Sequence, residues 1–245
     1  MIFFFVKISH MRNNENIYIK KIGDHDEFEV WLVDGALARK DLDENFTEYS
    51  YHEQYKFIPA NEIWIEKETN EDEWKYFLEN IDLERKYVAE GMTLDDAIDK
   101  ANIQEAKDRH HSARIKKILD SHHKRKESLL KIHKRKLDEW CTDYLTVWIV
   151  DGEMIRDLYM VGYGYGGHDL VYDFVPKNEI WLEEVLTPGD RKFILLHEMH
   201  ERNLMHNGKD YEHAHEGATI IEDRYRQNPE GLEERMREEL EKNNF

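Results

Sequence analysis

The stretch VWLVDG, at Val30 to Gly35, returns as VWIVDG at Val147 to Gly152, an offset of 117 residues. Holding this offset without a gap aligns YKFIPANEIWIE, from Tyr55, with YDFVPKNEIWLE, from Tyr172. Over 80 aligned positions 24 residues are identical, which chance does not produce over an ungapped span. The chain of 245 residues is therefore a tandem duplication, and we expect two similarly folded lobes.

Each copy begins with strand signals and ends with helix signals. The runs V-W-[LI]-V and E-I-W-[IL]-E are β-branched and aromatic, and Asp-Gly is expected to turn the chain between strands. In the second copy Thr187 and Pro188 predict a helix start and Gly208 a helix end, after which Asp210 starts a second helix running to about Gln227. The first copy has equivalent caps, with a glycine between its helices: Asn70, Thr93 and Gly91. The predicted class is α+β, with two tandem copies of a ββ(β)αα unit.

Two further helices are expected outside the repeated unit. The segment from Ala106 to Leu137 lacks Gly and Pro, which predicts a long connecting helix. Within it, Lys107 to Lys136 contains twelve Lys or Arg and three Asp or Glu, a net charge of +9. Because the whole chain has a net charge of −18, the rest of the chain has −27. After Pro229 a thin apolar stripe predicts a C-terminal helix docked on its own lobe: Leu232, Met236 and Leu240.

These features predict three regions: a first lobe over 1–106, a basic helical connector over 107–140 and a second lobe over 141–245. The connector is interpreted as a solvated strut against acidic lobes or a partner helix, with nucleic-acid contact as the alternative. Elsewhere the acidic charge disfavours binding to nucleic acid. Seven histidines are expected on the surface: His110, His111, His122, His123, His133, His206 and His213.

The composition narrows the function classes further. A single cysteine, Cys141, excludes an intrachain disulfide and a thiolate zinc cluster. No apolar run is long enough to span a bilayer, and the N-terminal MIFFFVKI is interpreted as a first strand or a ragged start. The expected location is the cytoplasm, or the host cytoplasm for a phage-encoded protein.

The candidate chemistry lies in FILLHEMHERNLMHNGKDYEHAHEGATIIED, Phe193 to Asp223. Helical spacing places His197 and Glu201 on one inward face, and His215 and Glu222 on the facing stripe of the next helix. Because an antiparallel hairpin turns near Gly208, Glu201 and His215 should lie at similar height. Buried polar side chains need partners, and a metal ion satisfies several of them together.

The first copy serves as a control for what the fold alone requires. Three residues recur as Glu84, Arg85 and Glu105, and are first explained as structural ion pairs or caps: Glu201, Arg202 and Glu222. Five other residues of the second copy are replaced by different residue types in the first: His168, His197, Glu198, His200 and His215. The residues at the equivalent positions of the first copy are Tyr51, Asn80, Ile81, Leu83 and Ile98. One site is therefore predicted, in the second lobe only, near the glycine-rich run GYGYGGHDL, Gly162 to Leu170.

Zinc suits this set of residues. Three imidazoles, from His168, His197 and His215, would hold the ion, with Glu201 as an oxygen ligand or as an orienter of the ligands. Glu198 would take the proton from the activated water. This is the logic of HExxH metallopeptidases, from which the chain departs because the fourth residue after His197 is Glu201. The competing interpretations are a metal-free polar network that stabilises the hairpin, and unrelated roles for individual histidines.

The second copy also resembles a family of uncharacterised phage and bacterial proteins. The shared order is VDG, GGH, EIW, LLHE-x-x-ER-x-LM-x-x-G and Y-x-x-AH, covering about Val147 to Glu222. The resemblance implies a phage or bacterial protein and no particular activity.

The leading prediction is a zinc-dependent hydrolase, similar in logic to metallopeptidases, that acts on a protein or peptide. The alternative is a non-enzymatic phage or host-interaction protein whose acidic surface binds a basic partner. A metal-dependent nuclease is disfavoured by the acidic lobes and by the lack of paired carboxylates at the usual spacing.

Overall fold

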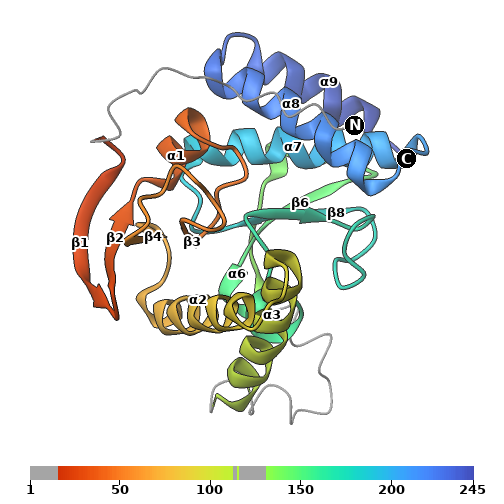
Figure 1. Ribbon diagram of the computed structural model, residues 1–245. Helices are drawn as coiled ribbons and strands as arrows, with labels where there is room; N and C mark the ends of the chain where they lie inside the picture. The colour runs from red at the N-terminus through yellow and green to blue at the C-terminus, as the bar shows by residue number, and fades with distance from the viewer. Residues whose placement is uncertain (1–15, 113–114, 116–130) are drawn as a thin grey trace.

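The two repeats form two four-stranded mixed sheets of the same topology. The computed structural model describes residues 16–112, 115 and 131–245 (Figure 1). The first sheet has the order β1-β2-β4-β3 and the second the order β5-β6-β8-β7. In each, the two central strands are parallel and the outer pairs are antiparallel. The strands are β1 (Tyr18–His25), β2 (Phe28–Val33), β3 (Tyr49–Tyr51), β4 (Glu62–Glu66), β5 (His133–Lys136), β6 (Thr146–Val150), β7 (Gly166–His168) and β8 (Glu179–Glu183).

The α+β class and the duplication are confirmed down to the register. Trp31 pairs with Trp64 in the first sheet, and Trp148 pairs with Trp181 at the equivalent place in the second. Two or three strands were expected in each unit, and the structure has four. The extra strands, β1 and β5, are largely polar and only partly buried, so they carry little of the hydrophobic pattern that signals a strand.

A short helix follows each VDG motif, where the sequence predicted a turn. The helices are α1 (Gly35–Asp41) and α6 (Gly152–Leu158). Asp34 and Asp151 act as N-caps, because each carboxylate accepts a hydrogen bond from a backbone N–H three residues further on. The glycine after each aspartate is required, since a Cβ at Gly35 would lie 2.2 Å from the Glu66 carboxyl carbon, with the same crowding at Gly152.

Five longer helices complete the units, and three of their four predicted caps are confirmed; the fourth, Asn70, caps the 3-10 turn that precedes α2. They are α2 (Trp74–Ala89), α3 (Leu94–His111), α7 (Pro188–His206), α8 (Tyr211–Gln227) and α9 (Leu232–Lys242), with 3-10 turns η2 (Glu71–Glu73) and η3 (Asp138–Trp140). Thr93, Thr187 and Asp210 cap α3, α7 and α8. The turns between the paired helices contain Gly91 and Gly208, whose φ angles of 98° and 91° favour glycine. As predicted, α9 docks on its own unit through its buried apolar stripe.

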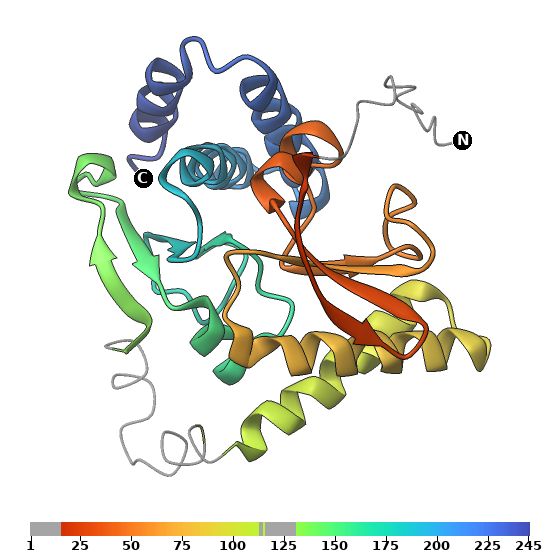
Figure 2. The same ribbon diagram turned by 90° about the vertical axis from the view of Figure 1, so that its left-hand side faces the viewer.

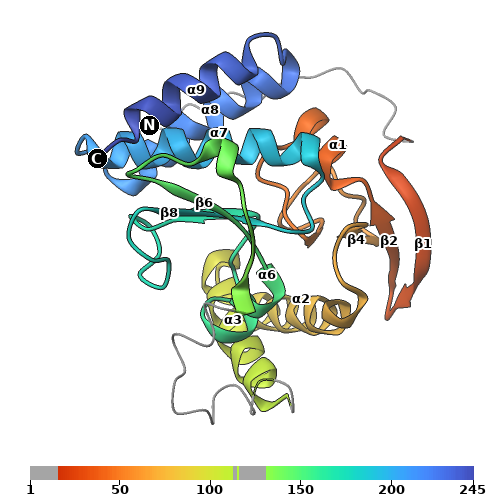
Figure 3. The same cartoon turned by 180° about the vertical axis from the view of Figure 1, so that it is seen from behind.

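Each sheet lies between two helical layers. In the first unit α2 covers one face and α1 the other, and in the second unit α7 and α6 do the same. Figures 2 and 3 show α1 of the first unit beside the α7–α8 layer, and α6 of the second unit beside α2 and α3. Each short helix therefore joins its own unit to the helix pair of the other.

The connector is not one long helix. Its first residues extend α3 to His111, and His133 to Lys136 form β5 at the edge of the second sheet. His122, His123 and most of the remaining connector lie outside the described residues. The helical prediction was wrong at β5. A basic segment without Gly or Pro resembles a helix in sequence, but here its backbone hydrogen-bonds to the edge of the second sheet. His133 is also not a surface residue: its ring stacks on Trp148 at 4.3 Å and its Nε2 contacts Glu179 at 3.1 Å.

The two units meet through buried ion pairs that repeat with the duplication. Arg39 on α1 binds Glu66 of its own sheet and Asp190 at the start of α7. Its counterpart, Arg156 on α6, binds Glu183 of its own sheet and Glu73 before α2. The Arg39 pairs dock the first unit against the helix pair that carries the candidate site, and the Arg156 pairs dock the second unit against the helix pair of the first.

Within the described part of the chain, no helix is both long and apolar enough to cross a bilayer.

Candidate metal site in the second unit

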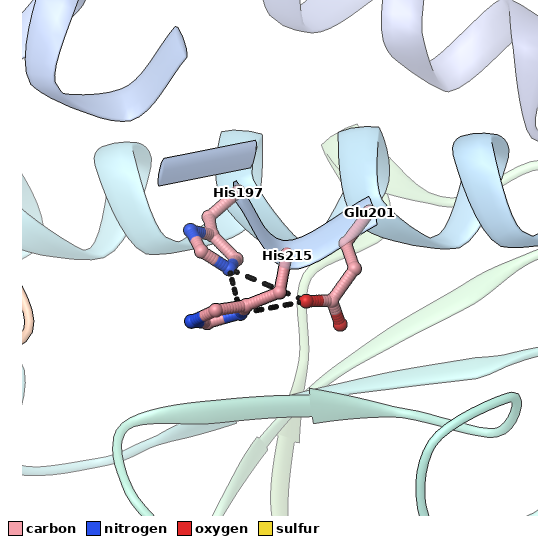
Figure 4. Close-up of side chains that lie close together, drawn as sticks. All are labelled: His197, Glu201 and His215. Atoms are coloured by element: carbon pink, nitrogen blue, oxygen red, sulfur yellow. Dashed lines mark hydrogen bonds and ion pairs between the residues drawn. The ribbon is translucent and has the colours of Figure 1, made fainter. Parts of the chain in front are cut away.

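Three predicted ligands converge beneath the α7–α8 hairpin. His197 and Glu201 lie one turn apart on α7, and His215 reaches them from α8 (Figure 4). The distance from His215 Nδ1 is 2.8 Å to Glu201 Oε2 and 3.1 Å to His197 Nε2. His197 Nε2 lies 3.6 Å from the same Glu201 oxygen. The hairpin thus brings the three side chains to one point, at the similar height that the sequence predicted.

These separations fit a transition-metal ion. A tetrahedral zinc ion with ligand bonds of about 2.0–2.1 Å holds its ligand atoms about 3.3–3.4 Å apart. The observed separations of 2.8, 3.1 and 3.6 Å lie on either side of that value. An ion would therefore be accommodated by side-chain adjustments of a few tenths of an ångström.

The second nitrogen of His197 is held by a carboxylate. Its Nδ1 lies 2.8 Å from Glu222 Oε2 on α8, and Arg226 donates to the other Glu222 oxygen at 2.8 Å. A proton on Nδ1 leaves Nε2 free to bind a metal, the arrangement found around most metal-ligating histidines. Glu222, which the sequence comparison explained as structural, therefore orients a candidate ligand as well.

His168 is fully buried and contacts the Glu201 carboxylate oxygen that does not contact His215. Its Nε2 is 3.1 Å from Glu201 Oε1, and its Nδ1 accepts a hydrogen bond of 3.2 Å from the backbone N–H of Leu170. An Nδ1 that accepts cannot carry a proton, so the ring proton is on Nε2 and points at Glu201. This geometry favours Glu201 as the candidate ligand and His168 as the residue that orients it. His168 is then not a third nitrogen ligand. His168 is the last residue of β7.

Glu198 points from α7 toward the glycine-rich strand β7. Its carboxylate lies within 4.8 Å of the ligand atoms of His168 and Glu201. The strand makes room for it, because a Cβ on Gly166 would lie 2.6 Å from Glu198 Oε1. Burial and the charge of Glu201 raise the pKa of Glu198 to about 8. A carboxyl group in this state exchanges a proton near neutral pH, as a general base or acid must.

The hairpin carries a balanced set of charges without a metal. Burial opposes protonation of His197, but hydrogen bonds to Glu201 and Glu222 outweigh it and raise the pKa of His197 to about 10. Contacts with His168, His197 and His215 likewise outweigh burial at Glu201 and hold its pKa well below the usual range. A metal ion must therefore displace a proton from His197, so the metal-free network competes directly with metal binding.

The first unit shows the same hairpin without the histidines. Gln54 donates to Glu84 at 2.9 Å, and Asn80 donates to Glu105 at 2.6 Å. Here burial raises the pKa of Glu84 to about 7, because no imidazole stabilises its charge. The fold accepts a glutamate at this position in both units, but only the second unit places histidines around it.

A cavity of about 280 Å³ opens onto the candidate ligands, at the small end for ligand pockets. Both units line it, and among the described residues its walls include acidic, aromatic and glycine residues but no Lys or Arg. The first unit supplies Glu44, Asn45, Phe46 and Thr47, and the second supplies Gly162, Gly164, Tyr165, Gly166, Gly167, Val171, Tyr172, Ile194, His197, Glu198, Glu201, Tyr211 and His215. The wall from the first unit was missed in the sequence, because no local pattern tells how two lobes pack.

The remaining predicted residues lie outside this cavity. His200 faces the C-terminal helix, where its Nδ1 is 3.2 Å from Glu239. Arg202 binds Asp169 at 2.7 Å, and its counterpart Arg85 binds Glu27, so both arginines tie α7 and α2 to loops of their own units. A second group with metal-ligand chemistry occurs on the first unit at His25, Asp26 and Asp82, of which Asp26 is exposed and the other two are partly buried.

Comparison of the chain with family models, with curated proteins and with solved structures finds no match.

Proposed function

We propose that the second unit is a zinc-dependent hydrolase centre in which His197, His215 and Glu201 hold the ion. The observation that carries this proposal is the convergence of Nε2, Nδ1 and Oε2 of these residues within 3.6 Å of one another, beside a cavity. Neutral imidazoles and one carboxylate are a donor set that zinc accepts in catalytic sites. Three protein ligands leave a fourth position for water facing the cavity.

The chain's own residues then have distinct tasks. Bound zinc lowers the pKa of water and polarises a carbonyl group. Glu198 accepts the proton of the attacking water and returns it to the leaving amine, so the carboxyl group ends as it began. Glu222 and His168 orient His197 and Glu201, each through a hydrogen bond.

The metal is tested by elemental analysis of purified protein. We expect close to one zinc ion per chain, lost in His197→Ala and in His215→Ala. The matched control is His213→Ala, because His213 is exposed on the same helix two residues away. His25→Ala should also keep the ion, since it removes only the exposed group on the first unit. Wild-type protein that folds normally and holds no zinc after incubation with the metal would overturn the proposal.

The catalytic step is tested separately with Glu198→Gln. This variant should retain zinc and lose hydrolysis of an unfolded protein substrate by at least a hundredfold, the usual range for loss of a general base. Unchanged activity would remove Glu198 from the reaction.

The net charge of −18 favours one rival, an acidic protein that binds a basic partner without chemistry. That role predicts salt-sensitive binding to a basic protein such as a histone, with the same affinity in wild type, His197→Ala and His215→Ala.

A further inference from the structure

The glycines that line the cavity are not all explained by the protein's own packing. Gly166 and Gly167 are required, because a Cβ at either would collide with Glu198 or Tyr172. Gly162 and Gly164 are not: an added Cβ would meet its nearest neighbours at 3.8 and 3.7 Å, an ordinary contact distance, and neither residue has a positive φ. Another reason for these two glycines is needed.

The first unit shows that the fold tolerates side chains there. Asn45 and Thr47 occupy the positions equivalent to Gly162 and Gly164, in the same loop before the same outer strand. The nearest neighbours of the added Cβ atoms are Asn102 and Thr47, both in the first unit. Side chains at these positions would therefore project into the gap between the two units, which the glycines keep open.

One wall of this gap is an open strand edge. β7 is the outer strand of its sheet, and the backbone N–H of Glu183 donates to Tyr165 O at 2.9 Å. In an antiparallel pair, alternate residues face the partner strand, so the N–H and C=O of Gly166 point away from β8. The outward carbonyl of His168 already accepts from the backbone N–H groups of Val171 and Tyr172, so Gly166 supplies the available carbonyl of this edge. Outward backbone groups on a strand edge pair readily with another extended chain. Gly166 also lies directly beside Glu198.

The charge of the cavity narrows the ligand class. Within the described residues no Lys or Arg lines it, whereas phosphate and carboxylate groups are recognised by such side chains. Tyr172 and Tyr211 add aromatic surface beside the zinc ligands. A substrate that offers backbone amides and neutral side chains suits these walls, and an anionic ester does not.

We infer that the cavity takes an extended peptide segment, paired with Gly166 at the outer edge of β7 and covered on its other side by Glu44 to Thr47 of the first unit. This inference rests on the zinc site proposed above and adds the way in which the peptide is bound and a task for the first unit. The first copy, which lacks the candidate ligands, is then one wall of a single site. The pairing would bring a substrate carbonyl beside Glu198 and the zinc ligands.

The test measures binding without turnover. Zinc-loaded Glu198→Gln protein is titrated into a mixture of fluorescein-labelled decapeptides of random sequence, and fluorescence anisotropy is recorded. We expect saturable binding that is at least tenfold weaker after Gly162→Asn with Gly164→Thr, which restore the residues of the first copy. Thr47→Trp, which fills the gap from the first unit, should have the same effect.

Controls separate this inference from the zinc proposal. Gly189→Ala on α7 has open space around its Cβ and should leave peptide binding unchanged. Glu90→Trp should do the same, since it adds the same bulk at an exposed site on the first unit. Zinc content is measured in every variant: absence of zinc from the wild type sinks the proposed function. If the zinc-loaded protein does not bind the peptides, or binds them equally well after the gap-filling substitutions, the inference about the peptide-binding cavity is wrong. The proposed zinc site is not affected by that result.

Discussion

The two buried ion-pair networks between the units should differ in how much they stabilise the protein. Asp190 is the shared acceptor of Arg39 and Arg226, and the side chains of all three are at most 2% exposed. Around it two guanidinium groups face three carboxylates, the other two being Glu66 and Glu222. In the metal-free protein, the protonated His197 also contacts Glu222, so this network is close to neutral.

The equivalent network around Glu73 is richer in negative charge. Arg156 and Arg109 share Glu73, but five carboxylates surround them, the others being Glu48, Glu183, Glu105 and Asp157. Burial and this crowding raise the pKa of Glu183 to about 8. Removal of Glu73 leaves four carboxylates for two arginines, whereas removal of Asp190 leaves two, Glu66 and Glu222, for two arginines and the protonated His197.

Asp190→Asn should therefore lower the free energy of unfolding by about 3–5 kcal/mol, the usual cost of breaking a buried pair. Glu73→Gln should cost less than about 2 kcal/mol, because the remaining carboxylates still neutralise both arginines. The assay is urea unfolding at pH 7 followed by tryptophan fluorescence. Glu233→Gln is the control, since its pair with Lys192 is exposed and screened by solvent, and should contribute little to stability. Equal costs at Asp190 and Glu73, or a cost at Asp190 no larger than that of the control, would refute this charge count.

Three further outcomes are expected. Burial raises the pKa of Glu84 to about 7, so the folded state binds this proton more tightly than the unfolded chain; urea unfolding should show up to about 3 kcal/mol of stability lost as pH rises from about 4.5 to 7, and Glu84→Gln should remove that loss. Glu222→Gln should weaken zinc binding by 10- to 100-fold in a chelator competition, because Glu222 orients His197. Gly166→Ala should push Glu198 out of place and reduce hydrolysis by more than tenfold while zinc content, measured by elemental analysis, stays near one.

Each of these changes has a matched control. Glu90 is an exposed glutamate at the end of the same helix as Glu84, so Glu90→Gln should leave the pH dependence of stability as it is in the wild type. Glu216→Gln lies exposed on the same helix as Glu222 and should not alter zinc affinity. Gly189→Ala should leave hydrolysis unchanged. A Glu84→Gln protein that keeps the wild-type pH dependence would assign the titration to another group.

The sequence predicted whatever depends on local spacing or on the repeat. The α+β class, the helix caps and the meeting of His197, His215 and Glu201 follow from the duplication and from helical periodicity. β1 and β5 escaped prediction because they are largely polar and only partly buried, and the short helices α1 and α6 because their arginines bind carboxylates elsewhere in the chain. The wall from Glu44 to Thr47 was missed because it contacts the other unit, and no local pattern shows such packing.

The exchange of roles between His168 and Glu201 shows what residue identity leaves undetermined. Glu84 and Glu201 are identical residues at equivalent positions, yet burial raises the pKa of one and three imidazoles lower that of the other. A glutamate that both copies share is held as an anion only when its neighbours change. Counting identities marks Glu201 as scaffold, while the hydrogen bonds around it mark it as part of the site, and both assignments hold at once. A repeat therefore identifies which positions the fold requires, but the surrounding side chains decide the charge that such a position carries and the chemistry open to it.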